Sequence, residues 1–250
     1  MPAGECTGGR LYESGVLEKA AGGVMRPGGL ELTARALDYC AFAAGANLVD
    51  VGCGAGVTVE FLREAYGLNA MGVDSSAVIV ERGLRRNPQI PLRQASGERL
   101  PFAAGAMDGV VVECVLSAMA DKREAMAEFN RVLGPGGRLI VTDLYARRAA
   151  VTGEIGLPPT SCLAGMRTQE QLVRLVEETG FSIEVWEDHT PKLSEFVIRM
   201  IMEHGSMQPF WECEKSDSRL IQGAIKESKP GYFLLIARKT QEFAEGNSHE

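Results

Sequence analysis

A glycine-rich turn that follows a short apolar run carries the residues best suited to binding chemistry. The run Asn47–Val51 leads into Gly-Cys-Gly-Ala-Gly at 52–56, and apolar residues at helical spacing come next. Glycines let a backbone approach a ligand closely, and the N–H groups at the start of the next helix can donate to it. Asp74 lies twenty residues past Gly54, after a second apolar run, where a carboxylate can accept both hydroxyls of a ribose. The pattern predicts a nucleoside cofactor.

Two cofactors of this kind compete for the turn. The dinucleotide fingerprint G-x-G-x-x-G requires a third glycine where this chain has Val57. Asp50 stands two residues before the first glycine, where it gains nothing from a pyrophosphate but can attract the ammonium of an amino-acid moiety. The residues therefore favour S-adenosylmethionine over NAD.

Short apolar runs alternate with helical patterns along most of the chain. We expect strands at 47–51, 70–73, 92–94, 109–114, 138–144, 181–187 and 231–239, and helices at 30–42, 57–66, 77–86, 123–133 and 168–179. This alternation predicts an α/β fold with a doubly wound, mostly parallel sheet. We expect one domain over 1–240, with 1–46 as an N-terminal helical cap, 191–227 as a helical insertion before the last strand, and 241–250 as a frayed tail.

Composition narrows the class of protein. The chain has 250 residues, with 33 acidic against 26 basic side chains and a net charge of −7, which argues against nucleic acid as a partner. No apolar stretch is long enough to cross a membrane, and the first residues lack a signal-peptide pattern. The six cysteines form no CxxC pair, and three histidines are too few for a common zinc site, so we expect thiols and no metal. A cytoplasmic protein without a membrane partner is predicted; monomer and homodimer both stay open.

Four motifs in order resemble those of the class I S-adenosylmethionine-dependent methyltransferases. They are the turn at 50–56, Gly72-Val-Asp74, Glu98-Arg-Leu-Pro-Phe102 and Arg131-Val-Leu-Gly-Pro-Gly-Gly-Arg138. The resemblance covers about 28–188 and the last strand, and it implies a Rossmann-like sheet of seven strands with the last strand antiparallel. It also implies S-adenosylmethionine as cofactor and S-adenosylhomocysteine as product. The segments 114–122, 142–145 and 161–165 look most like the arsenite and quinone methyltransferases of the small-molecule branch.

The resemblance implies a set of cofactor-binding residues. Asp50 and the turn glycines are expected at the methionine end, Asp74 at the ribose and Ser96 at the adenine amine, where the family often has an acid or amide. The full expected set is Asp50, Gly52, Cys53, Gly54, Gly56, Asp74, Ser75, Ser96, Gly97, Glu98 and Cys114, with Tyr12 closing over the cofactor from the N-terminal segment.

Acceptor residues are harder to identify from the sequence. The acceptor must lie over the carboxyl ends of strands one, four and five, and the catalytic candidates near there are Cys162, Tyr145 and His189. Cys162 could bind a soft acceptor, and His189 could be a base oriented by a carboxylate. An ordinary loop thiol and a surface histidine are the structural alternatives.

The expected function is methyl transfer to a small-molecule acceptor, with a thiol or a metalloid among the candidates. One alternative is a regulatory module that binds S-adenosylmethionine without turnover. The other is an NAD-type oxidoreductase, which Val57 and Asp50 disfavour.

Overall fold

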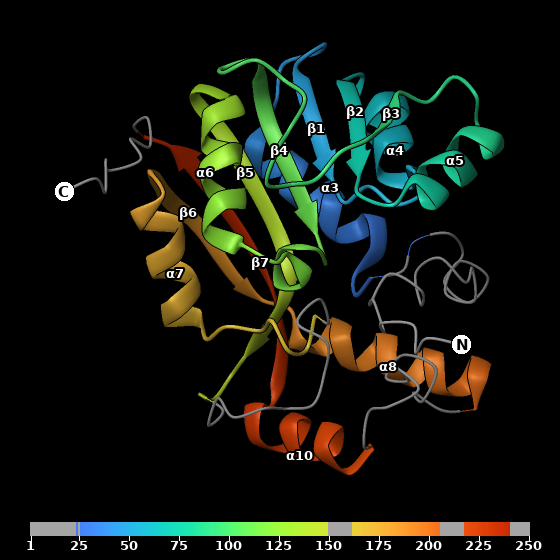
Figure 1. The fold of residues 1–250 in the computed structure, drawn as a ribbon, viewed down its shortest axis with the longest axis vertical. Helices are drawn as coiled ribbons and strands as arrows, with labels where there is room; N and C mark the ends of the chain where they lie inside the picture. The colour runs from blue at the N-terminus through green and yellow to red at the C-terminus, as the bar shows by residue number, and fades with distance from the viewer. Residues whose placement is uncertain (1–23, 25, 150–161, 206–217, 241–250) are drawn as a thin grey trace, which may run out of the picture.

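Seven strands form one sheet in the computed structural model, which describes Val24 and residues 26–149, 162–205 and 218–240. The strand order is β3-β2-β1-β4-β5-β7-β6, and β7 alone runs antiparallel to its neighbours (Figure 1). The expected doubly wound, mostly parallel sheet with an antiparallel last strand is therefore confirmed. The strands are β1 (Asn47–Val51), β2 (Asn69–Asp74), β3 (Leu92–Gln94), β4 (Met107–Glu113), β5 (Leu133–Ala146), β6 (Phe181–Asp188) and β7 (Pro230–Lys239).

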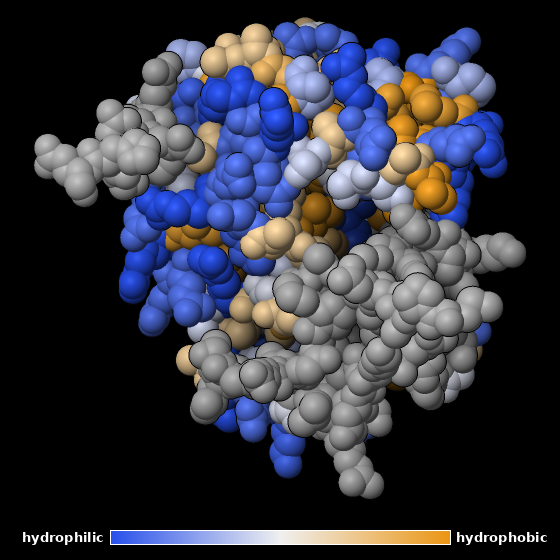
Figure 2. Space-filling model, in the orientation of Figure 1, coloured by the Kyte–Doolittle hydropathy of each residue, from blue (hydrophilic) through white to orange (hydrophobic). Residues whose placement is uncertain are grey.

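Helices cover both faces of this sheet (Figure 1). They are α3 (Gly29–Cys40), α4 (Val57–Tyr66), α5 (Ala77–Arg86), α6 (Lys122–Val132), α7 (Gln169–Glu178), α8 (Thr190–His204) and α10 (Ser218–Ser228), with a 3-10 turn, η1, at Leu116–Ala118. The outer surfaces of α6 and α7 are mostly hydrophilic (Figure 2), because their apolar faces are turned toward the sheet.

Strand residues alternate between two hydrophobic cores. Val49 and Val51 of β1 pack in the core that α6 and α7 cover, whereas Leu48 packs in the core that α3 and α4 cover. Successive side chains of a strand point to opposite faces, so Asp50 shares the α3/α4 side with Leu48. This alternation decides which polar side chains meet behind the site.

Side-chain caps fix where the helices beside the sheet begin. Asp121 accepts from the backbone N–H groups of Arg123 and Glu124 at the start of α6, and Thr168 forms a capping box with Gln171 at the start of α7. Ser76 caps α5 by accepting from Ile79 N. Each cap satisfies N–H groups that have no partner within the helix.

Two parts of the expected layout differ from the structure or lie outside it. β5 is longer than expected, because Leu133 pairs with Met107 and the strand continues beside β7 as far as Ala146. The expected insertion contains α8 and α10, while 206–217, the tail 241–250 and most of the N-terminal cap lie outside the described residues. The domain boundaries stay a prediction. No helix among the described residues is long and apolar enough to cross a membrane.

Candidate functional site

A cavity of about 410 Å³ opens at the carboxyl ends of β1, β2 and β4. Parallel strands bring these ends to one edge of the sheet, and in such folds ligands bind in the crevice there. Residues expected at the cofactor do line it, namely Gly52, Cys53, Gly54, Asp74, Ser75, Ser96, Gly97, Glu98 and Cys114. Lining residues that the sequence analysis did not single out include Arg26, Thr58, Ser76, Glu113 and Met119.

The turn after β1 is a backbone structure that tolerates little change. Gly52 has φ +73°, and a Cβ there would lie 2.3 Å from Val115 Cγ2. The N–H groups of Gly52 and Cys53 both donate to the carbonyl of Val73, at 2.8 and 3.0 Å. This ties the turn to the end of β2 and holds the next backbone groups at the cavity.

Asp74 organises two loops of the cavity at once. Its Oδ2 accepts from Gly54 N at 3.0 Å, and its Oδ1 accepts from Ser76 N at 2.9 Å. One carboxylate therefore joins the glycine turn to the start of α5. Because Asp74 itself lines the cavity, it is also at hand for a ligand hydroxyl.

The third loop of the cavity carries Ser96, Gly97 and Glu98. The Ser96 hydroxyl donates to the Glu98 carboxylate, so the two side chains form one polar unit at the wall. A Cβ on Gly97 would lie 2.6 Å from Met119 Cε, which shows how closely this loop approaches the segment after β4. The serine expected at an adenine amine is thus already bound to a carboxylate neighbour.

Two expected cofactor residues stand behind the cavity wall and do not line it. Asp50 is buried, and burial raises its pKa well above the usual range; the Glu113 charge raises it further, while Arg26 acts in the opposite direction. Gly56 faces Ile90 and Leu92, and its φ of +85° serves the turn into α4. The strand alternation explains Asp50, since its side chain shares a face with α3 and α4.

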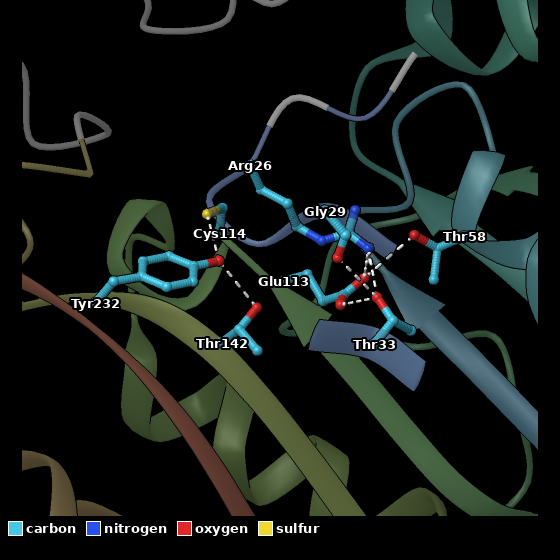
Figure 3. Close-up of polar contacts among 8 residues, drawn as sticks. All are labelled: Arg26, Gly29, Thr33, Thr58, Glu113, Cys114, Thr142 and Tyr232. Carbon is cyan, nitrogen blue, oxygen red and sulfur yellow. Dashed lines mark hydrogen bonds and ion pairs between the residues drawn. The ribbon is translucent and has the colours of Figure 1, made fainter. Parts of the chain in front are cut away.

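An ion pair that the sequence did not reveal lies at the cavity (Figure 3). Arg26 Nη2 is 2.6 Å from Glu113 Oε2, and the two side chains are 11% and 3% exposed. Thr33 Oγ1 and Thr58 Oγ1 both donate to the Glu113 carboxylate, at 2.7 and 3.1 Å. We call Arg26, Thr33, Thr58 and Glu113 the Glu113 cluster. Its members come from three separate elements and the segment before α3, so no local motif indicates it.

Cys114 follows Glu113 in the chain and makes a separate set of polar contacts. Its φ of +58° is rare for a residue with a side chain, and the thiol is 3.1 Å from the hydroxyl of Tyr232. The Tyr232 hydroxyl is also 3.0 Å from Thr142 Oγ1 (Figure 3). Burial raises the pKa of the Cys114 thiol well above its usual range, Asp143 raises it further, and the hydrogen bond with Tyr232 lowers it.

Cys162 belongs to a turn that packs against Ser117, three residues after Cys114. A charge on Cys162 raises the pKa of the Cys114 thiol. In the same turn, Gly165 lies against Ser117, where a Cβ would be 1.7 Å from the carbonyl oxygen. Ser117 is itself held by Asp143, which accepts from its N–H and its hydroxyl, both at 2.7 Å. The structure thus brings the turn of one expected acceptor residue to the segment that follows one expected cofactor residue.

None of the three catalytic candidates, Cys162, Tyr145 and His189, is among the lining residues. Tyr145 is buried between aromatic rings and donates to Asp188 Oδ2 at 2.8 Å. His189 Nε2 lies 3.0 Å from Glu187 Oε2, so a carboxylate does orient it, but at the start of α8. Tyr12 falls outside the described residues. No group of three or more metal-ligating side chains is arranged around a common point in the described ranges.

Comparison with known proteins finds a family model that matches part of this chain. Residues 49–141 match the family model described as a methyltransferase domain. An arsenite methyltransferase from Halobacterium salinarum is 27% identical over 153 residues, which cover 57% of this chain and 39% of that enzyme. The chain spans 56% or less of the length of the first curated relatives that it matches.

Solved structures share the fold. Phosphoethanolamine N-methyltransferase 2 of Haemonchus contortus, in complex with S-adenosyl-L-methionine, has a TM-score of 0.72 at 18% identity and covers 94% of this chain and 58% of that one. The [4+2]-cyclase SpnF has a TM-score of 0.73 at 23% identity, over 93% and 94% of the two chains. At such identities the likeness shows the fold alone.

Proposed function

The chain belongs to the class I S-adenosylmethionine-dependent methyltransferases, and from this premise we propose that it transfers a methyl group from S-adenosylmethionine to a small-molecule acceptor. The cavity at the carboxyl ends of β1, β2 and β4 carries this proposal, because it combines the glycine turn with Asp74. Its volume of about 410 Å³ is typical of small-molecule sites.

Each wall of the cavity has a proposed part in holding the cofactor. Asp74 accepts ribose hydroxyls, the turn at Gly52 and Gly54 faces the methionine end, and the Ser96–Glu98 loop faces the adenine. Asp50 acts through its charge from behind the wall, where its pKa falls toward normal once an ammonium lies nearby.

Calorimetric titration of the reduced protein with S-adenosylmethionine, S-adenosylhomocysteine and NAD in parallel tests the cofactor. We expect micromolar binding of the first two and none of NAD. Binding of NAD alone would overturn the proposal and leave only a likeness of fold.

The groups at the cavity favour a soft acceptor. The titratable residues in its described lining are Arg26, Cys53, Asp74, Glu98, Glu113 and Cys114, without a histidine, lysine or tyrosine. A phenol or a carbon acid needs a general base to release its proton, whereas a thiol or a trivalent metalloid needs little such help. We therefore propose a sulfur or metalloid acceptor, bound between Cys114 and the turn that holds Cys162.

When bound, the cofactor supplies the electrophilic methyl group. The residues of this chain have to align an acceptor lone pair with that carbon and keep water away. The acceptor lone pair forms the new bond, and the electrons of the breaking carbon–sulfur bond stay with the cofactor sulfur. Because burial raises the pKa of Cys114, its loss of a proton to bind a metalloid is costly, and the Tyr232 hydroxyl offsets part of that cost.

Three cysteine variants test the acceptor. Cys114→Ser and Cys162→Ser remove the proposed thiol ligands, while Cys40→Ser makes the same change on α3, at a cysteine with no proposed part in acceptor binding. We expect S-adenosylhomocysteine formation with arsenite or a small thiol to fall steeply in the first two and to stay normal in the third. Wild-type rates in all three, or turnover of phenols alone, would exclude the soft acceptor.

Cofactor binding without turnover is the second candidate function. The described lining favours it in one respect, since it has no histidine, lysine or tyrosine, and its carboxylates Asp74, Glu98 and Glu113 already accept hydrogen bonds from the protein. Tight binding of S-adenosylmethionine with no S-adenosylhomocysteine formed from any acceptor would support this alternative.

A further inference from the structure

Arg26 and Glu113 form a buried ion pair among the residues that line the cavity. Figure 3 shows the guanidinium lying against the Glu113 carboxylate. Glu113 ends β4, on the same face of the sheet as Asp50, so the carboxylate points toward α3 and α4 rather than into the core under α6. The Arg26 guanidinium is thus a buried cation placed where it can reach a ligand in the cavity.

The hydrogen bonds of the Glu113 cluster hold the guanidinium in one orientation. Arg26 Nη2 contacts Glu113 at 2.6 Å and donates to Thr33 Oγ1 at 2.7 Å. Thr33 and Thr58 then donate to the two carboxylate oxygens of Glu113, so that carboxylate is bound from both sides. Burial disfavours the charged guanidinium, but Glu113 together with Tyr232, Asp50 and Cys114 outweighs this and leaves the pKa of Arg26 raised, so Arg26 stays cationic.

We propose that Arg26 binds the α-carboxylate of the cofactor's amino-acid end, and that Glu113 is the residue that positions it. A guanidinium has five N–H donors in a planar fork that matches a carboxylate, and the contacts to Glu113 and Thr33 use one of its three nitrogens. The inference rests on the proposed cofactor and makes Arg26 a residue that distinguishes ligands with a carboxylate from ligands without one.

The competing explanation is structural. Arg26 immediately precedes α3, so its ion pair could simply anchor that helix over the sheet. The two explanations differ in one measurable respect. An anchor affects all ligands of the cavity alike, whereas a carboxylate receptor affects only those that have a carboxylate.

A paired titration separates these explanations. We would measure Kd by calorimetry for S-adenosylhomocysteine and for its decarboxylated analogue, in the wild-type chain and in Arg26→Met, Arg26→Lys and Glu113→Gln. Arg35→Met is the matched control, because Arg35 lies on α3 and makes an ion pair of the same 2.6 Å length with Glu187 but does not line the cavity. Thermal unfolding of each variant checks that it is folded.

We expect the wild-type chain to prefer the carboxylated ligand by about 10- to 100-fold, as one or two charged hydrogen bonds allow. Arg26→Met should abolish the preference, Arg26→Lys and Glu113→Gln should reduce it, and Arg35→Met should leave it unchanged. Equal weakening of both ligands in Arg26→Met would overturn the inference and leave Arg26 as an anchor. If the wild-type chain binds neither ligand, the proposed cofactor fails first and this inference fails with it.

Discussion

The cavity wall beside β1 and β2 is made largely of backbone groups, whereas the wall beside β4 depends on side chains from distant parts of the chain. On the first side, Gly52, Gly54 and Asp74 are joined by hydrogen bonds between two neighbouring strand ends. On the second side, Cys114 meets Tyr232 across 118 residues of sequence. We therefore expect few substitutions to preserve the shape of the wall beside β1 and β2, which is the cofactor side. On the wall beside β4, the acceptor side, a single side chain can be replaced without moving the backbone. Four variants test this contrast.

The largest effect is expected at Gly52. Gly52→Ala puts a Cβ 2.3 Å from Val115 at a left-handed φ, and we expect cofactor affinity to fall about 100-fold, or about 3 kcal/mol. Gly67→Ala is the control, because Gly67 has φ +62° with nothing within 4 Å of the new Cβ. It should lose only about 1–2 kcal/mol of stability and bind normally. Equal binding by the two variants, measured by calorimetry, would contradict a backbone-defined wall.

Asp74→Ala comes next. It removes the carboxylate that joins Gly54 to Ser76 and that we propose for the ribose. Cofactor binding should weaken by about 1.5–3 kcal/mol per charged hydrogen bond lost, which is at least about tenfold. Asp38→Ala is the control, since the Asp38 carboxylate accepts a hydrogen bond from the Tyr66 hydroxyl at the surface of the molecule. Unchanged affinity in Asp74→Ala would exclude the ribose assignment.

Tyr232→Phe tests the acceptor side and should leave the cofactor side alone. Loss of the hydroxyl removes the hydrogen bond that lowers the pKa of Cys114, so the pKa rises. The rate of Cys114 alkylation can be followed by site-resolved mass spectrometry at several pH values. At a given pH this rate should fall a few-fold in the variant, while cofactor affinity stays unchanged. A variant that loses cofactor binding as strongly as Asp74→Ala would break the proposed division between the two walls.

The smallest expected effect concerns the stability of the unliganded protein and involves Asp50. Burial raises the pKa of Asp50 in the folded state, so its contribution to stability is complete below the ordinary pKa of 3.8 and is lost as the pH rises through the raised value. Asp50→Asn carries no charge and loses nothing over that range. The free energy of unfolding of the variant relative to wild type, measured with urea, should therefore increase with pH. Parallel pH profiles would show that Asp50 is not a buried, ionisable group.

Much of the fold followed from local patterns. The bounds expected for β1, β3, α4 and α5 are those of the structure, because each element has its own apolar periodicity and is bounded by glycine, a cap or a turn. β5 was expected to be shorter, since its ends depend on pairing with Met107 and with the antiparallel β7. A sequence shows periodicity, but pairing at strand ends depends on partners elsewhere.

Spacing along the chain was enough to predict the glycine turn, Asp74 and the Ser96–Glu98 loop as one site, because parallel strands must bring these loops to the same edge. Three features could be seen only in the folded chain: Asp50 stands behind the wall, Arg26 pairs with Glu113, and the turn of Cys162 packs against Ser117. A period of two along a strand separates its two faces without saying which helix covers each. That choice is made by packing, when α3, α4 and the last strands bury their apolar sides against the sheet.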